Sequence, residues 1–164
     1  MSGDANYSKI LAKMDEPSLF ERKDEKEVSA YRFLWLRSEH EPVCIRMEKR
    51  GDDIKGRLVR LSGSGHNFGG SVDQREFTVA AGEWSKLQEK LSATQFWGMP
   101  SPTNEDGFGG SQWIVEGISG GKYHVTDCWS PDQNASARRL QAFVDCGKYF
   151  LQLAHIQVPD SKFY

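Results

Sequence analysis

Hydrophobic and polar positions alternate over much of the chain, which is the pattern of β-strands. In YRFLWLRS, residues 31–38, both alternating faces are partly apolar, and this predicts a central strand rather than an exposed edge. Residues 41–63 alternate on either side of the sequence RGDD, which predicts a hairpin with its turn there. The glycine-rich GSGHNFGG, residues 63–70, predicts a loop, and residues 71–80 alternate as a further strand.

Two other segments change to the helical period of three and four residues. NYSKILAKM, residues 6–14, predicts a short helix near the start of the chain. The apolar residues of AGEWSKLQEKL, residues 81–91, repeat at the same spacing and predict a second helix. Phe96 and Trp97 follow it after four intervening residues, and we expect both rings to form a hydrophobic plug beneath the end of that helix.

A last helix is predicted over residues 130–156. Ser130 is its expected N-cap, and Pro131 suits the first helical position. Gly147 lies in the middle and costs roughly 1 kcal/mol relative to alanine, so it predicts close packing against another element. The apolar stripe that we expect to be buried consists of Leu140, Phe143, Val144, Gly147, Leu151 and Ala154.

The order of these elements predicts an α+β fold, with an antiparallel sheet of about six strands and two or three helices packed on one face. We divide the chain into an N-terminal helix and charged linker over residues 1–30, a single α+β domain over 31–158 and a tail over 159–164. Residues 21–27 are all charged, which predicts a solvated linker or a surface helix.

The stretch GSQWIVEGISGGKYHVTDCWSP predicts a hairpin whose register is readable from the sequence. If Gly120 and Gly121 form its turn, Glu116 lies opposite Val125. Residues directly opposite share a face of the sheet and alternate with the other face along each strand. Trp113 and Trp129 then lie on opposite faces, so we expect the hairpin to be packed from both sides.

This register limits the chemistry of the hairpin. His124 and Asp127 point to opposite faces, so they do not form the His–carboxylate pair of a nucleophile triad. His124 and Cys128 share a face but lie roughly 13 Å apart along the strand. Glu116 and Asp127 share a face on neighbouring strands, and they are the one candidate pair of catalytic carboxylates. The structural alternative is that both carboxylates pair with basic residues of other strands or lie at a solvent-facing rim.

Composition favours one domain that binds another protein. The chain has 164 residues, with five Trp and nine Phe to fill a core. Residues 31–70 hold eight basic and five acidic residues, whereas residues 71–130 hold four basic and eight acidic residues. Such uneven charge suits a protein partner, but an ordinary mixed surface explains it more simply. A pI near 6.1 and the lack of an RNA-binding motif argue against nucleic acid as a partner.

Cysteine spacing and hydropathy bear on the redox state and the compartment. Cys44, Cys128 and Cys146 cannot all pair within the chain, and their spacing matches no metal site. We therefore predict neither a metal nor a cofactor, and the sequence leaves open whether the thiols are free. No apolar run is long enough to span a membrane, and the start lacks the apolar centre of a secretory signal. We expect a cytoplasmic protein, or a periplasmic or envelope protein if a signal segment was trimmed.

Several motifs together resemble a family of small bacterial proteins that have no assigned function. They are YRFLWLR at residues 31–37, FW at 96–97, and SQWIVEG with GKYHVTDCWSP over residues 111–131. The resemblance covers roughly residues 31–155 and implies a shared fold. Many members of that family look exported or lipid-anchored, which the start of this chain does not indicate. The resemblance implies no reaction, cofactor or catalytic residue.

Three functional hypotheses follow. The first is a non-catalytic protein-binding domain, such as a bacterial toxin-immunity protein or an inhibitor, with contact residues His66, Phe68, Asp106 and Phe108 in two glycine-rich loops. The second is a small hydrolase that uses the Glu116 and Asp127 carboxylates, both lining one pocket. The third is an envelope-associated structural domain. The sequence names no partner and leaves the oligomeric state open.

Overall fold

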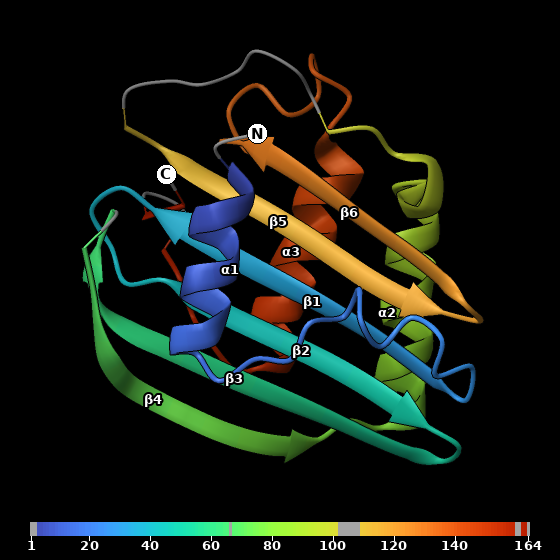
Figure 1. Cartoon of the computed structure of the whole chain (residues 1–164). Coiled ribbons are helices and arrows are strands. Elements are labelled where there is room, and N and C mark those ends of the chain that lie inside the picture. The colour runs from blue at the N-terminus through green and yellow to red at the C-terminus, as the bar shows by residue number, and fades with distance from the viewer. Residues whose placement is uncertain (1–2, 66, 102–108, 160–161, 164) are drawn as a thin grey trace.

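The computed structural model describes residues 3–65, 67–101, 109–159 and 162–163. One antiparallel sheet of six strands forms the centre of the molecule, in the order β4-β3-β2-β1-β5-β6 (Figure 1). The predicted α+β class with an antiparallel sheet is therefore confirmed. The strands are β1 (Val28–Arg37), β2 (Val43–Arg50), β3 (Asp53–Ser64), β4 (Asn67–Thr78), β5 (Ser111–Ser119) and β6 (Lys122–Trp129).

The predicted strand pairings agree with the observed register. β1 lies between β2 and β5, and this confirms the central position that was predicted from the apolar residues on both its faces. β2 and β3 form the hairpin, with Gly51 and Asp52 at the turn between them. In the second hairpin Ser119 pairs with Lys122 and Glu116 with Val125 across the Gly-Gly turn, which is the predicted register.

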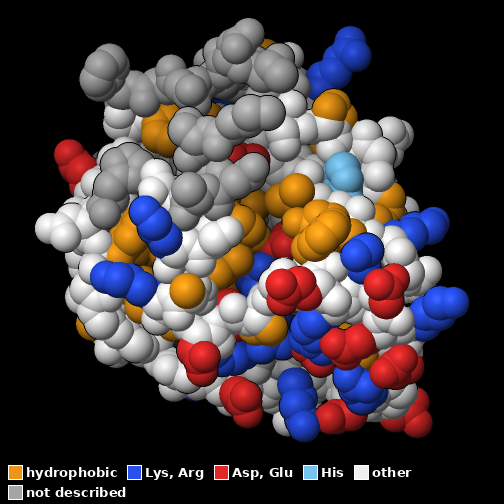
Figure 2. Space-filling view, in the orientation of Figure 1, with side chains coloured by type: hydrophobic (Ala, Val, Ile, Leu, Met, Phe, Trp, Pro, Cys, Tyr) orange, Lys and Arg blue, Asp and Glu red, His pale blue; other side chains and the backbone are white. Residues whose placement is uncertain are grey.

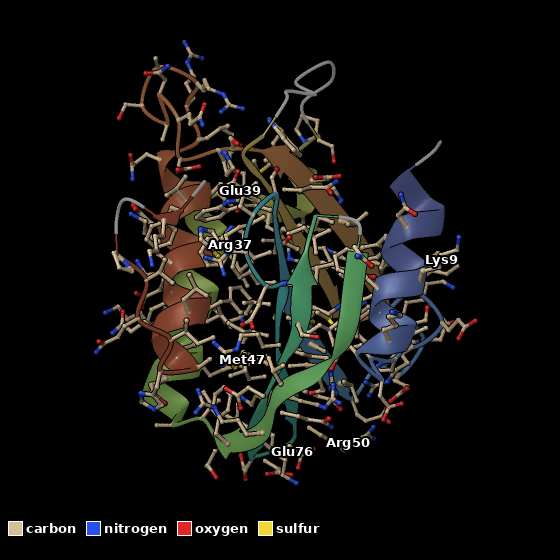
Figure 3. All side chains as sticks on the ribbon, turned by 90° about the vertical axis from the view of Figure 1, so that its left-hand side faces the viewer. Lys9, Arg37, Glu39, Met47, Arg50 and Glu76 are labelled. Atoms are coloured by element: carbon tan, nitrogen blue, oxygen red, sulfur yellow. The ribbon has the colours of Figure 1, made fainter. Side chains whose placement is uncertain are left out.

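The helices lie on both faces of the sheet rather than on one. α2 (Ala81–Ala93) and α3 (Gln141–Leu153) cover one face, and α1 (Gly3–Lys13) lies across the other (Figures 1 and 3). The expectation that all helices share a face was wrong for α1. Ile10 and Leu11 of α1, and Met14 just after it, are buried against β1, β2, β3 and β5, so the second face of the central strands is also covered.

The main core lies between the sheet and the α2–α3 layer and is unusually aromatic. Phe33, Trp35 and Trp113 are fully buried there, and their ring centroids lie 5.4–6.5 Å apart. Gly147 of α3 packs on this group: a Cβ there would lie 2.6 Å from the Trp113 ring. The close approach predicted from a mid-helix glycine is confirmed, and so is the placement of Trp113 and Trp129 on opposite faces.

α3 begins later than its predicted cap. Ser130 extends the sheet instead, because its N–H donates to the Ser111 carbonyl and its hydroxyl accepts from the Ser111 N–H. Residues 131–139 form turns, and Asn134 and Arg139 have positive φ angles of 54° and 58°. That left-handed backbone is incompatible with a right-handed helix. The helix therefore starts at Gln141, and the expected N-cap at Ser130 was wrong.

Two further expectations need correction. GSGHNFGG is not a long loop, since β3 continues to Ser64 and β4 begins at Asn67. The aromatic plug after α2 is half right: Phe96 is buried, but Trp97 remains 38% exposed. The sequence left open whether the three thiols are free. Cys44, Cys128 and Cys146 are all buried, and they form no disulfide.

Candidate functional site

A row of charged side chains crosses the sheet on the face that carries α1. The register sets Arg57 of β3 opposite Arg46 of β2, and Arg46 opposite Arg32 of β1. Arg32 in turn lies opposite Glu116 of β5, and Arg57 lies opposite Glu76 of β4. Three arginines therefore stand side by side on neighbouring strands. Like charges directly opposite each other destabilise a sheet, so this row requires anions.

Glu16 supplies the central anion. One carboxylate oxygen accepts from Arg32 Nη1 at 3.2 Å and from Arg46 Nε at 2.9 Å, and the other accepts from Arg57 Nη1. The Glu16 side chain is only 1% exposed. One buried carboxylate thus joins three strands of the sheet to the segment that follows α1.

The end of α1 explains how Glu16 reaches this position. Asp15 adopts a left-handed backbone with φ of 53°. Its N–H donates to the Ala12 carbonyl, and the Glu16 N–H donates to the Leu11 carbonyl. This is the Schellman arrangement that ends many helices, here with Asp in place of the usual Gly. The turn reverses the chain and points Glu16 at the arginines.

Glu116 is the second buried anion of the row. Its carboxylate accepts from Arg32 Nη2, from the Tyr7 hydroxyl of α1 and, at 2.9 Å, from the Tyr123 hydroxyl of β6. Glu116 is 2% exposed. Burial raises the pKa of the Tyr7 phenol, which keeps it a neutral hydrogen-bond donor. The arrangement fixes α1 and β6 to the centre of the sheet.

The predicted carboxylate pair shares a face but not an environment. Asp127 lies opposite Ile114 and so faces the same side as Glu116. It accepts from Gln112 Nε2 at 2.6 Å, and its backbone N–H donates to Ser101 Oγ. Glu116 is instead enclosed by Arg32 and two tyrosines. In this structure the Glu116 carboxylate is a hydrogen-bond acceptor for all three of these side chains.

The charged residues 21–27, which follow α1, form ion pairs with β2 at the outer end of this network. Arg22 donates to both carboxylate oxygens of Glu48 at 2.9 Å, and Glu48 also accepts from Arg46. These hydrogen bonds, above all from Arg22, hold the pKa of the Glu48 carboxyl below its usual range. Residues 21–27 form turns rather than a helix, and their ion pairs with β2 hold them against the sheet.

Beyond the end of α1 the same face is open to solvent. A hollow of about 380 Å³ lies over β2, β3 and β4. Figure 2 shows blue and red side chains gathered where β2 ends and β3 begins in Figure 1. We call this surface the charged strip; its lining residues are Arg46, Glu48, Arg50, Asp53, Lys55, Gly56, Arg57 and Glu76.

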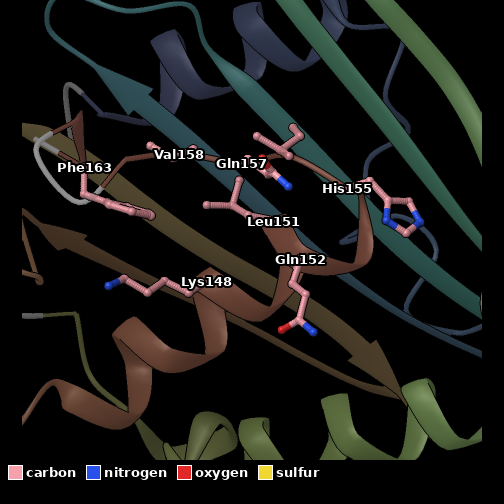
Figure 4. Close-up of a pocket in the computed structure, with 8 residues that line it drawn as sticks. Lys148, Leu151, Gln152, His155, Gln157, Val158 and Phe163 are labelled. Atoms are coloured by element: carbon pink, nitrogen blue, oxygen red, sulfur yellow. The ribbon is translucent and has the colours of Figure 1, made fainter.

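A second hollow, of about 480 Å³, lies between α3 and the chain that follows it (Figure 4). Leu151, Ile156 and Phe163 form its apolar part. The Lys148 ammonium lies 4.6 Å from the centre of the Phe163 ring. Neither Glu116 nor Asp127 lines this hollow or the charged strip.

The residues expected in the contact loops fall mostly outside the described part of the chain. His66, Asp106 and Phe108 are outside the described residues. Phe68 is half-buried in β4, where it packs with the apolar cluster beneath α1. Its carbonyl accepts from Lys13 Nζ at 2.6 Å. Phe68 thus belongs to the contact between α1 and the sheet.

Sequence reasoning missed Glu16, Arg32 and Tyr7, the three residues that complete the buried network. Arg32 carried one signal, because a basic residue stands in an otherwise apolar strand that was predicted to be central. A buried arginine implies a buried acid. The identity of that acid depends on where α1 crosses the sheet, which no local pattern encodes.

Metal ligands and relatives add no further site. Within the described residues, no group of three or more His, Cys, Asp and Glu side chains could hold a metal ion, and no helix there is long and apolar enough to cross a membrane. The chain matches no protein-family model and no curated protein.

Proposed function

We propose that this chain is a non-catalytic protein-binding domain that occupies a partner enzyme, as an inhibitor or a toxin-immunity protein does. The observation that carries the proposal is the charged strip. Three of its side chains stand in solvent on the open face of the sheet: Arg50, Asp53 and Lys55 are 52%, 62% and 65% exposed. In contrast, the Glu116 carboxylate is buried and accepts hydrogen bonds from Tyr7, Arg32 and Tyr123.

The chemistry of the strip suits a protein better than other ligands. Small-molecule sites are mostly apolar with a few polar groups, whereas this hollow is lined almost wholly by charges. Nucleic acid requires a basic surface, whereas Glu48, Asp53 and Glu76 interrupt the basic residues here. Positive and negative side chains alternate on the strip, which favours a partner protein whose surface carries the complementary charges. Such complementarity gives specificity and raises the association rate.

The first experiment compares three baits in lysate of the source organism. They are the wild type, the double variant Arg50→Glu/Lys55→Glu on the strip, and Glu89→Lys as a matched control on the exposed side of α2. We expect one stoichiometric partner that the wild type and the control retain and the strip variant loses. The captured protein is then assayed for enzyme activity with and without the domain, and we expect inhibition.

Three results would contradict the proposal. A partner that binds the strip variant as well as the wild type would exclude the strip as the contact surface. A partner whose activity is unaffected would exclude inhibition. A hydrolytic activity of the isolated domain that Glu116→Gln abolishes, in a variant with an unchanged circular dichroism spectrum, would instead establish the carboxylate hypothesis.

A further inference from the structure

β4 is an edge strand whose outer side is open. It is the terminal strand of the sheet, and among the described residues only β3 pairs with it (Figures 1 and 3). The other edge strand, β6, is covered in part by the chain that precedes β5: the Asp127 N–H donates to Ser101 Oγ, and the Thr126 hydroxyl donates to the Met99 carbonyl. An uncovered edge presents N–H and C=O groups that a further strand can pair with.

The order of charges along β4 is self-complementary. Two copies of one strand that pair antiparallel about a two-fold axis perpendicular to the sheet keep their faces. Residues opposite each other then differ by an even number of positions. If Gln74 lies on the axis, Asp73 of each copy faces Arg75 of the other. The symmetry produces this pair of opposite charges twice.

The neighbouring registers lack this complementarity. An axis through Asp73 sets Asp73 opposite itself, an axis through Arg75 sets two arginines opposite each other, and an axis through Glu76 sets two glutamates opposite each other. Like charges directly opposite disfavour pairing. Charges on an edge strand ordinarily oppose association; in β4 the sign changes across Gln74, so of these registers the one centred on Gln74 brings opposite charges together.

The local geometry of β4 leaves these residues available. The ladder with β3 is regular from Asp73 to Thr78 and irregular at Val72, so Asp73, Gln74 and Arg75 around the axis lie in its regular part. Arg75 is exposed and donates through Nη2 to the Ala154 carbonyl at 2.7 Å. A guanidinium has five N–H donors, so it keeps this bond while it binds a carboxylate. Val72, which is 49% exposed, would be covered by the second copy.

From these observations we infer that β4 pairs with β4 of a second copy of this chain, antiparallel and centred on Gln74, to form one sheet that continues through both copies. This inference is independent of the charged strip as a contact surface. Of the residues that line the strip only Glu76 lies on β4; its side chain stays on the sheet face, opposite Val72 of the second copy.

Sedimentation equilibrium over a concentration series tests the pairing with two charge-reversal variants, Asp73→Arg and Arg75→Asp. We expect the wild type to be a dimer and each variant alone to be monomeric, because each sets like charges opposite each other twice. An equimolar mixture of the two variants restores both opposite-charge pairs, so we expect a heterodimer. Glu76→Lys, on the other face of the same strand, is the matched control and should remain a dimer.

Thermal melting of each variant checks its fold, and Arg75→Lys, which keeps the charge, should also remain a dimer. If a single reversal does not fold, the double variant Asp73→Arg/Arg75→Asp carries the test, because it should dimerise like the wild type. A wild type that is monomeric at every concentration would overturn the inference. So would a dimer that both reversals leave intact, or a mixture of the two variants that stays monomeric.

Discussion

The buried carboxylate of Glu16 yields the sharpest prediction, for the variant Glu16→Gln. Glutamine preserves the size of the side chain but removes the charge that lies against Arg32, Arg46 and Arg57. Removing one partner of a buried ion pair costs about 3–5 kcal/mol, because the remaining charges stay buried and uncompensated. Since domains are stable by only about 5–15 kcal/mol, we expect the loss of a large share of the free energy of unfolding.

Urea unfolding followed by tryptophan fluorescence measures this loss. A destabilisation of about 3 kcal/mol lowers the urea midpoint by roughly 1–3 M for the m-values of about 1–3 kcal/mol/M that small domains show. Glu27→Gln is the matched control: Glu27 pairs with Arg50 at 2.8 Å, but its side chain is 61% exposed. Exposed pairs contribute little, so we expect a change below about 1 kcal/mol.

A Glu16→Gln variant within about 1 kcal/mol of the wild type would refute the reasoning that Glu16 neutralises the arginine row. A double-mutant cycle with Arg57→Gln adds a second test. If the two side chains interact as the structure indicates, the double variant is less destabilised than the sum of the single variants. Strict additivity would mean that the contact contributes nothing to stability.

Three further predictions concern the core, the pH dependence and the thiols. Gly147→Ala gains roughly 1 kcal/mol of helix propensity but forces a methyl group into the Trp113 ring, so we expect a net loss of about 1 kcal/mol in urea unfolding; a stabilised variant would contradict the packing. The Glu48 carboxyl has a lowered pKa in the folded state, so its stabilisation is present above about pH 4.3 and is lost as the pH falls; Arg22→Gln should flatten this acid-side decline in an unfolding series. Burial raises the pKa of Cys146 to about 12, so we expect a thiol reagent at pH 8 to modify this residue only in urea, and rapid reaction in buffer would exclude its burial.

The sequence determined the elements that depend on local periodicity. Alternation predicted the β1, β2 and β3 strands, and a Gly-Gly turn was enough to place Glu116 opposite Val125, as found. Gly147 indicated the close helix contact. These predictions succeed because side-chain direction in a strand and spacing on a helix follow from the backbone itself. Ser130 failed as a helix cap because its backbone is held by pairing with Ser111, which lies nineteen positions away in the chain.

Only the tertiary structure decided which side of the sheet α1 covers and which charges meet. Arg32, Arg46 and Arg57 lie eleven or more positions apart in the chain, and only the strand order β3-β2-β1 makes them neighbours. Glu16 becomes their common partner because the turn at Asp15 folds back over that row. The sequence therefore determined the strands and their faces, whereas the assembled sheet determined the electrostatics. A charge is costly or stabilising according to the neighbours that folding brings to it.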